Sequence, residues 1–129
     1  MRHHTVTATL AAPRDQVFAY IADIEKLPEW ATKFARELRL VDGRHKVVNG
    51  QGEFFLEIRA DAESGVIDML AGPSDDALLC FPTRVVATPV GGSAFTFTMF
   101  QAPGRPDEQF EKQHASLLRE FENLKQRFD

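Results

Sequence analysis

The stretch APRDQVFAYIADIEKLPEWA, residues 12–31, contains two predicted helix starts and is the part of the sequence most informative about the fold. Pro13 favours a start, because the N–H that proline lacks would be unpaired at a first helical position. From Val17 to Ile24 apolar residues recur at helical spacing, which predicts a short helix over residues 13–23. Pro28 interrupts this helix and starts a second short one that carries Trp30 and Phe34.

On either side of this stretch the sequence predicts strands. Before it, residues 5–10 alternate threonines with apolar side chains, as a half-buried strand does. After it, Asp42-Gly43, Asn49-Gly50 and Gly91-Gly92 are the dipeptides that two-residue hairpins prefer. Because each strand follows the last through a short turn, the sheet is predicted to be antiparallel. Six strands are expected in this part of the chain, over residues 35–41, 44–48, 51–62, 65–71, 76–90 and 93–101.

The last segment, residues 106–128, predicts one long amphipathic helix. Pro106 suits its first position, and Asp107 and Glu108 suit the positive end of its dipole. Together these elements predict an α+β protein with one six- or seven-stranded antiparallel sheet. The apolar stripe of the helix consists of Phe110, His114, Leu117, Leu118, Phe121, Leu124 and Phe128.

Composition limits the classes of function. The chain has 129 residues, 43% of them hydrophobic, which favours one globular domain over residues 1–129. A net charge of -4 disfavours a nucleic-acid binder, and a single cysteine excludes an internal disulfide framework. No apolar run approaches the roughly 20 residues that a membrane span needs. Because the N-terminal residues alternate like a strand rather than a signal peptide, we expect a cytoplasmic protein.

The hairpins also predict which side chains share a face of the sheet, since directly opposed residues point the same way. A register slip of one residue would exchange the two faces, and Pro82 could add a bulge that does so. The turns pair Leu40 with His45, His45 with Phe54, Ile58 with Met69, Met69 with Leu78, Ile67 with Cys80, Val86 with Phe97 and Arg84 with Met99. The apolar face is then predicted to hold Leu38, Leu40, His45, Val47, Phe54, Leu56, Ile58, Ile67, Met69, Leu78, Cys80, Arg84, Val86, Phe95, Phe97 and Met99.

On the opposite face, mostly charged residues and threonines are expected, with three apolar exceptions. Phe55, Leu70 and Phe81 would form an exposed patch there, through which a homodimer is possible.

The chain resembles the helix-grip fold of the START-like SRPBCC superfamily, over essentially its whole length. The resemblance is carried by APRDQVF at residues 12–18, LPEWA at residues 27–31, FTFTMFQ at residues 95–101 and DEQF at residues 107–110. The last two segments are similar to small bacterial members labelled polyketide cyclase/dehydrase. The resemblance implies a curved seven-stranded sheet around the C-terminal helix, with a cavity for a hydrophobic ligand between them.

Three functions are compatible with that resemblance. The first is binding of a lipid-like or aromatic polyketide-like small molecule in the cavity. The second is a cyclase or dehydratase that uses His114 or His45 as its proton carrier. The third is a protein-interaction module whose cavity is filled by phenylalanines. For the first two, the expected ligand-binding residues are His45, Phe54, Leu56, Ile58, Met69, Arg84, Phe95, Phe97, Met99, Phe110, His114 and Leu117.

The polar members of this set have alternative interpretations. His114 could be a packed histidine at the contact between helix and sheet, and His45 could be solvated near its hairpin end. Arg84 could extend to solvent or pair with an acid such as Glu63. Cys80 is expected to be an inert buried hydrophobe.

No metal or cofactor is expected from the sequence. His3 and His4 are adjacent, so in a strand they would point to opposite sides. No two histidines have helical ligand spacing, and the iron-binding motif of the oxygenase branch of the superfamily has no counterpart here.

Overall fold

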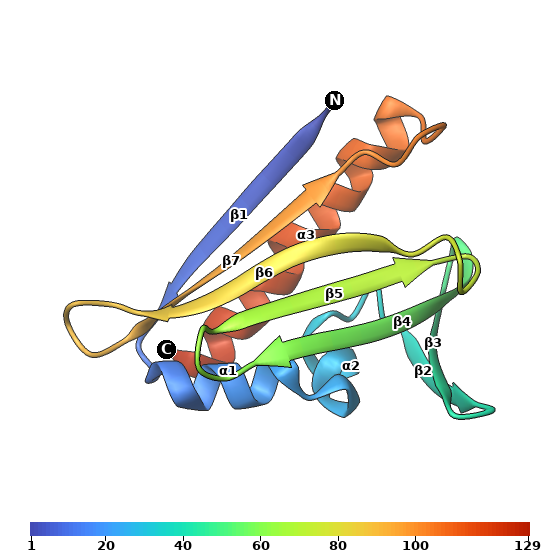
Figure 1. Cartoon of the computed structure of the whole chain (residues 1–129). Coiled ribbons are helices and arrows are strands. Elements are labelled where there is room, and N and C mark those ends of the chain that lie inside the picture. Colours follow the sequence, from blue (N-terminus) through green and yellow to red (C-terminus); the bar gives the residue numbers. More distant parts are fainter.

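The computed structural model describes residues 1–129 and confirms the expected α+β architecture (Figure 1). Seven strands form one antiparallel sheet in the order β1-β7-β6-β5-β4-β3-β2. The strands are β1 (His3–Leu10), β2 (Glu37–Val41), β3 (Arg44–Asn49), β4 (Gly52–Asp61), β5 (Val66–Gly72), β6 (Leu79–Ala87) and β7 (Ser93–Phe100). The helices are α1 (Arg14–Ala22), the short 3-10 helix η1 (Ile24–Lys26), α2 (Leu27–Trp30) and α3 (Asp107–Phe128).

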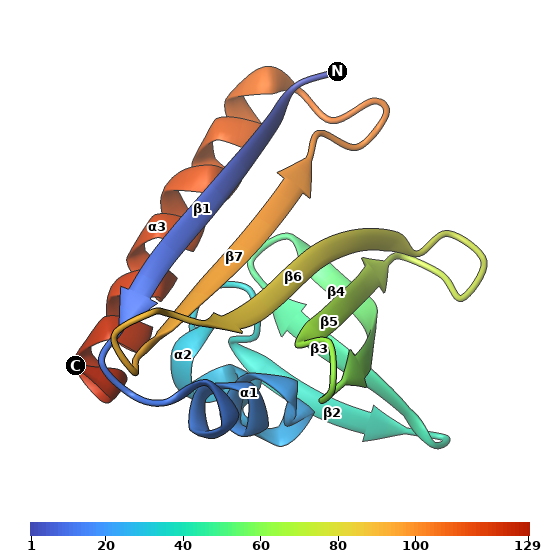
Figure 2. The same ribbon diagram turned by 60° about the vertical axis from the view of Figure 1, so that its left-hand side comes forward.

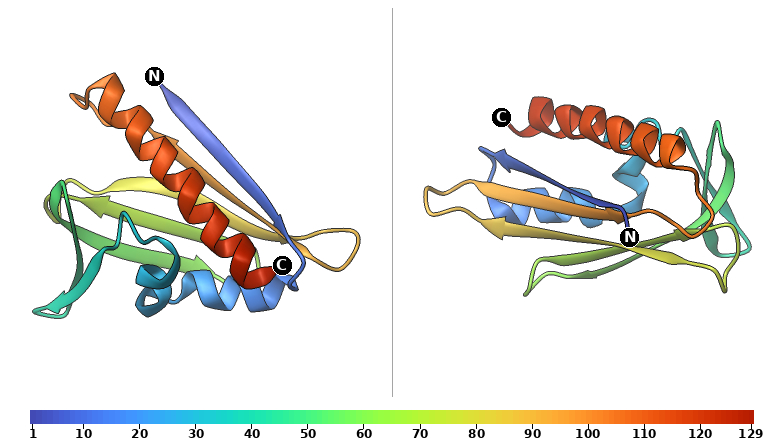
Figure 3. Two further views of the ribbon diagram at one scale, coloured as in Figure 1. Left: turned by 180° about the vertical axis from the view of Figure 1, so that it is seen from behind. Right: turned by 90° about the horizontal axis from the view of Figure 1, so that it is seen from above.

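All helices lie on one side of the curved sheet. Figure 2 shows α3 running alongside β1 and β7, and Figure 3 shows it crossing the face of the sheet on the side of α1 and α2. We call this side of the sheet the inner face. None of the helices is both long enough and apolar enough to cross a membrane.

The two short helices form as their sequence predicts, except at the end of the second. Pro13 precedes α1, and the Asp23 side chain accepts a hydrogen bond from the Glu25 backbone N–H at the start of η1. Helix α2 ends at Trp30, so Phe34 lies beyond it. In the segment after Trp30 the Ala35 N–H still donates to the Ala31 carbonyl, whereas the N–H groups of Lys33 and Phe34 find their acceptor on α3.

The core is densest where α2 and α3 meet β7. Phe95 of β7 is fully buried, stacks on Phe121 of α3 at 5.2 Å between ring centres, and meets the edge of Trp30 at 6.0 Å. Aromatic contacts of this kind add about 0.5–1.5 kcal/mol per pair to the burial of apolar area. This aromatic cluster fixes α3 on the sheet.

Several predicted strand registers are confirmed. Leu40 pairs with His45, and Ile58 pairs with Met69. Between β3 and β4 the pairing is shifted by two residues, so that His45 lies opposite Leu56 rather than Phe54. An even shift keeps each side chain on its predicted face.

The predicted register of β6 is wrong by three residues, and an odd shift exchanges the two faces of the strand. Thr83, rather than Cys80, pairs with Ile67, and Arg84 pairs with Thr96 rather than Met99. The pairing runs through Pro82 without interruption, so proline is not the cause.

The cause is the length of the two connections that flank β6. The strand begins only at Leu79, and the turn after it spans residues 88–92, where the Thr88 N–H donates to the carbonyl of Gly92. Gly92 packs against the end of β1, and a Cβ atom there would lie 2.4 Å from the Leu10 carbonyl oxygen. Phe81, Thr83 and Val85 therefore share the inner face, as their partners Met69, Ile67 and Phe95 show. Cys80, Arg84 and Val86 share the outer face, and Leu78 precedes the strand.

The outer face lacks the exposed apolar patch that was expected from Phe55, Leu70 and Phe81. Phe81 belongs to the inner face, where its ring lies 5.9 Å from that of Phe97. Phe55 is half-buried, with the Lys46 ammonium 4.5 Å and the Arg44 guanidinium 5.2 Å from its ring centre. None of the expected patch residues is among the large hydrophobic side chains that the structure leaves exposed.

Candidate functional site

A pocket of about 790 Å³ lies between the inner face of the sheet and the N-terminal half of α3. Its apolar wall comes from the middle strands, from α3 and from the short α2 region. Apolar side chains lining it include Phe54, Leu56, Met69, Phe81, Phe97 and Met99 on the sheet, Leu117 on α3, and Leu27, Trp30, Ala31 and Phe34 around α2.

Three connections surround the exposed end of the pocket. They are the β3–β4 turn at residues 49–51, the β5–β6 loop at residues 73–78 and the β7–α3 loop at residues 101–106. The Arg105 Nη1 atom donates a hydrogen bond to Gln51 Oε1 at 3.2 Å, which joins two of these connections. A ligand would enter through this end, where loops rather than strands form the boundary.

Glu120 is the one carboxylic acid among the residues that line the pocket, and only 4% of it is exposed. Its Oε2 atom accepts hydrogen bonds from the backbone N–H groups of Lys33 and Phe34, both at 3.1 Å. Burial raises the pKa of Glu120 to about 7, although the two backbone donors act in the opposite direction. A carboxyl group with such a pKa can hold or release a proton near neutral pH.

Glu120 was not among the predicted site residues, although the sequence contains a signal for it. It stands three residues after Leu117 and four before Leu124, which places it on the apolar stripe of the last helix. Its partners in the segment after Trp30 are far away in the sequence and could not be read from it.

Trp30, which also lines the pocket, carries a second buried polar group, its indole N–H. Its Nε1 atom is buried and has no hydrogen-bond partner. The backbone carbonyl of the same residue accepts a hydrogen bond from the Asn123 side chain of α3 at 2.9 Å. An unpaired buried donor costs about 1–3 kcal/mol, so Trp30 is held by packing on Phe95 rather than by its indole N–H.

Of the predicted ligand-binding residues, half line the pocket and half do not. Ile58, Phe95 and Phe110 belong to the surrounding core instead, and Phe95 and Phe110 are fully buried within it. The lining residues are Phe54, Leu56, Met69, Phe97, Met99 and Leu117.

None of the three predicted polar residues lines the pocket. His45 lies near the surface, with its Nε2 atom 3.3 Å from a carboxylate oxygen of Glu25. Arg84 is on the outer face, because the predicted register of β6 is wrong by an odd number of residues, and its Nε atom donates to the carbonyl of Ser64 at 3.1 Å.

His114 lies on α3 but faces β1 rather than the pocket. Its ring stacks on that of His4 at 3.6 Å between centres, with an angle of 4° between the planes. Burial, followed by the proximity of His4, lowers the pKa of His114 below its usual value. No histidine lines the pocket, and its titratable lining residues are Glu120, Lys33, Arg105 and Lys112.

Comparisons with known proteins were informative at the level of structure only. No family model matches the sequence, and no curated protein matches it. Among solved structures, XoxI from Bacillus cereus has a TM-score of 0.77 at 16% identity, covering 99% of this chain and 96% of that chain. A START superfamily protein from Mycobacterium smegmatis has a TM-score of 0.67 at 15% identity, covering 98% of this chain and 96% of that chain.

A third similar structure is that of an enzyme. The Zhui aromatase/cyclase from Streptomyces sp. R1128 has a TM-score of 0.67 at 19% identity, covering 95% of this chain and 87% of that chain. These similarities cover between 95% and 99% of this chain and between 87% and 96% of the other chains. The chain therefore has the helix-grip fold of the START-like proteins.

Proposed function

We propose that this protein binds a hydrophobic small molecule, lipid-like or aromatic and polyketide-like, in the pocket between the sheet and α3. The observation that carries the proposal is the pocket itself, with a volume of about 790 Å³ and a mainly apolar wall. Pockets for small-molecule ligands fall between roughly 300 and 1,000 Å³. The volume argues against an interaction module whose cavity is filled by phenylalanines.

The apolar side chains of the pocket wall and the carboxyl group of Glu120 contribute differently to ligand binding. Burial of apolar ligand area contributes about 25 cal/mol per Å², so the aromatic and aliphatic side chains provide most of the affinity. Glu120 provides orientation, since its carboxyl group can donate a hydrogen bond when protonated and accept one when ionised. The preferred ligand therefore carries one hydrogen-bonding group, such as a hydroxyl or carbonyl, on an otherwise apolar body.

Catalysis in the same pocket is the second candidate, favoured by the pKa of Glu120 at about 7. A general acid or base acts best when its pKa lies near the working pH. In this case Glu120→Gln would retain ligand binding and lose turnover, whereas a pure binding protein would have no turnover to lose.

The binding proposal is tested with a substitution that fills the pocket. Ser116 lines the pocket from α3, whereas Gln126 is exposed further along the same helix. We expect the wild-type protein to bind a hydrophobic fluorescent dye saturably and to retain apolar molecules in native mass spectrometry. Ser116→Trp should abolish saturable dye binding, and Gln126→Trp should leave it unchanged.

Circular dichroism and thermal denaturation serve to establish that both variants are folded. The proposal is refuted if the wild-type protein shows neither saturable dye binding nor a retained ligand. It is equally refuted if folded Ser116→Trp protein binds the dye as tightly as the wild type does.

A further inference from the structure

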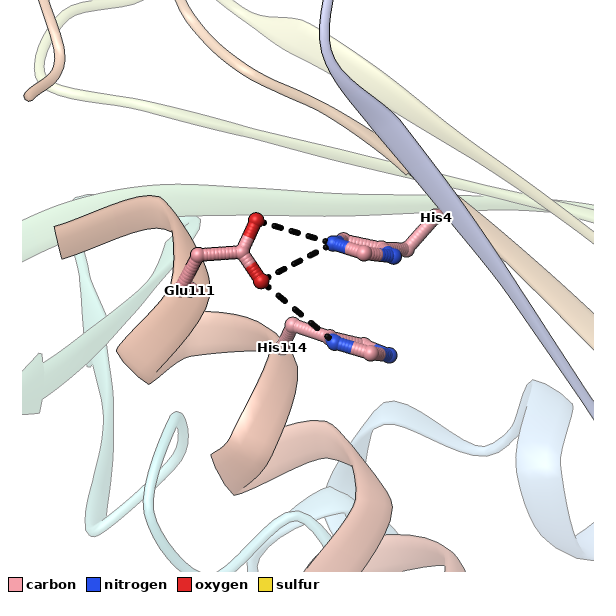
Figure 4. Close-up of side chains that lie close together, drawn as sticks. All are labelled: His4, Glu111 and His114. Carbon is pink, nitrogen blue, oxygen red and sulfur yellow. Dashed lines mark hydrogen bonds and ion pairs between the residues drawn. The ribbon is translucent and has the colours of Figure 1, made fainter. Parts of the chain in front are cut away.

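Three side chains of types that can ligate a metal, His4 on β1 and Glu111 and His114 on α3, lie close together, as Figure 4 shows. The His4 Nε2 atom lies 3.1 Å from each carboxylate oxygen of Glu111. The His114 Nδ1 atom lies 3.9 Å from Glu111 Oε2. One potential ligand atom from each residue can be chosen so that all three lie within 4.8 Å of one another.

The fold holds these side chains in place. Glu111 and His114 are three residues apart on α3, so they lie on the same side of the helix. His4 is on β1, and its ring stacks on those of His114, at 3.6 Å between centres, and Phe110, at 5.4 Å. Because Phe110 is fully buried, the His4 ring rests on a fixed part of the core. The fold therefore brings the three side chains together, although the rings are not yet directed at one point.

The cluster is separate from the pocket. None of its three residues lines the pocket, whereas their neighbours Lys112 and Gln113 do. Helix α3 thus presents one side to the pocket and another to β1. A function for this cluster is independent of the ligand-binding proposal.

The donor set fits a divalent transition-metal ion. Zinc binds imidazole nitrogens and carboxylate oxygens at about 2.0–2.2 Å, in sites that leave a fourth position for water when the protein supplies three ligands. Two imidazoles with one carboxylate also suit neighbouring first-row ions such as Co²⁺. The side chains of His4, Glu111 and His114 are 29%, 43% and 23% exposed, so an ion and its water can approach from solvent.

Two adjustments accompany binding. The two histidine rings are parallel to within 4°, so at least one must turn to direct its lone pair at a shared ion. Arg2 also contacts Glu111, with its Nη1 atom 3.3 Å from Oε1, and it must move aside. It has an alternative partner, because its Nη2 atom is 3.2 Å from a carboxylate oxygen of Asp107.

We propose that His4, Glu111 and His114 form a binding site for one divalent transition-metal ion of the zinc type, which links the edge strand β1 to α3.

The proposal is tested by titrating chelator-treated protein with Zn²⁺ in a calorimeter and with Co²⁺ in a spectrophotometer. We expect one Zn²⁺ ion per chain and visible absorption bands of four-coordinate Co²⁺. His4→Ala, His114→Ala and Glu111→Gln should each weaken Zn²⁺ binding at least about tenfold. Zn²⁺ should also raise the thermal midpoint of the wild type but not of these variants.

His3→Ala is the matched control, because His3 is exposed and adjacent to His4 on the same strand. It should bind Zn²⁺ as the wild type does. Loss of binding in His3→Ala with binding retained in folded His114→Ala would overturn the proposal, since the ion would then be held by the adjacent histidines alone. Absence of stoichiometric Zn²⁺ binding to the folded wild type would also overturn it. The dye assay on the same samples reports on the pocket separately.

Discussion

Glu120 shows how one residue links the stability of the protein to pH. Its pKa of about 7 in the folded protein lies above the ordinary value of 4.5, so the folded state holds this proton more tightly than the unfolded state. The resulting stabilisation is complete below about pH 4.5 and is lost as pH rises through 7. At neutral pH the buried carboxylate is therefore a cost to the fold, which is typical of residues kept for function rather than stability.

We predict that Glu120→Gln becomes more stable than the wild type as pH rises. Its amide oxygen can still accept from the Lys33 and Phe34 backbone, and no charge is buried. The difference in unfolding free energy should grow between pH 4.5 and 7 by up to about 3 kcal/mol, as measured by urea denaturation at several pH values. Glu122→Gln, exposed on the same helix, should follow the wild-type profile. The prediction would be contradicted if the unfolding free energies of Glu120→Gln and the wild type changed with pH in parallel.

At the scale of elements, α3 is fixed to the sheet mainly by its aromatic face. Phe121 is 3% exposed and contacts Phe95 and Phe97, with ring centres at 5.2 and 6.5 Å. We predict that Phe121→Ala lowers the unfolding free energy by about 3–5 kcal/mol. Leu118→Ala, on the exposed side of α3, should change it by less than about 0.5 kcal/mol. Chemical denaturation measures both, and similar losses in the two variants would show that the aromatic face is not what fixes the helix.

The elements also differ in how far the sequence determines them. The helices around Pro13, Pro28 and Pro106 and the pairing of β4 with β5 follow from local signals, and all were predictable. The register of β6 was not, because it depends on how β7 pairs with β1 and on how much chain the flanking loops use. The same register error led to the wrong prediction that Arg84 lies on the face of the sheet that lines the pocket. The cluster of His4, Glu111 and His114 could not be predicted for a related reason, because His4 meets Glu111 only through the packing of β1 on α3.

For the whole molecule, the binding proposal predicts coupling between ligand and global stability. A ligand that binds only the folded state at about one hundred times its dissociation constant adds about 2.7 kcal/mol. For a domain of this size that corresponds to a rise in thermal midpoint of about 10 °C. We expect this rise in the wild type with a saturating apolar ligand found by native mass spectrometry, and no rise in Ser116→Trp. Scanning calorimetry measures it, and an equal shift in both proteins would place the ligand elsewhere.

The sheet order has a consequence for how the molecule assembles. β1 pairs along its whole length with β7, from His3 opposite Phe100 to Leu10 opposite Ser93. Closing so long a loop is entropically costly and slows folding, because the paired residues are far apart in the sequence, as with His3 and Phe100. On the ribosome, β1 is made before the other six strands and can pair with β7 only after all of them have been synthesised. Helix α3, which forms one wall of the pocket, is made later still, so a nascent chain exposes its apolar inner face, and needs protection from aggregation, until that helix has been made.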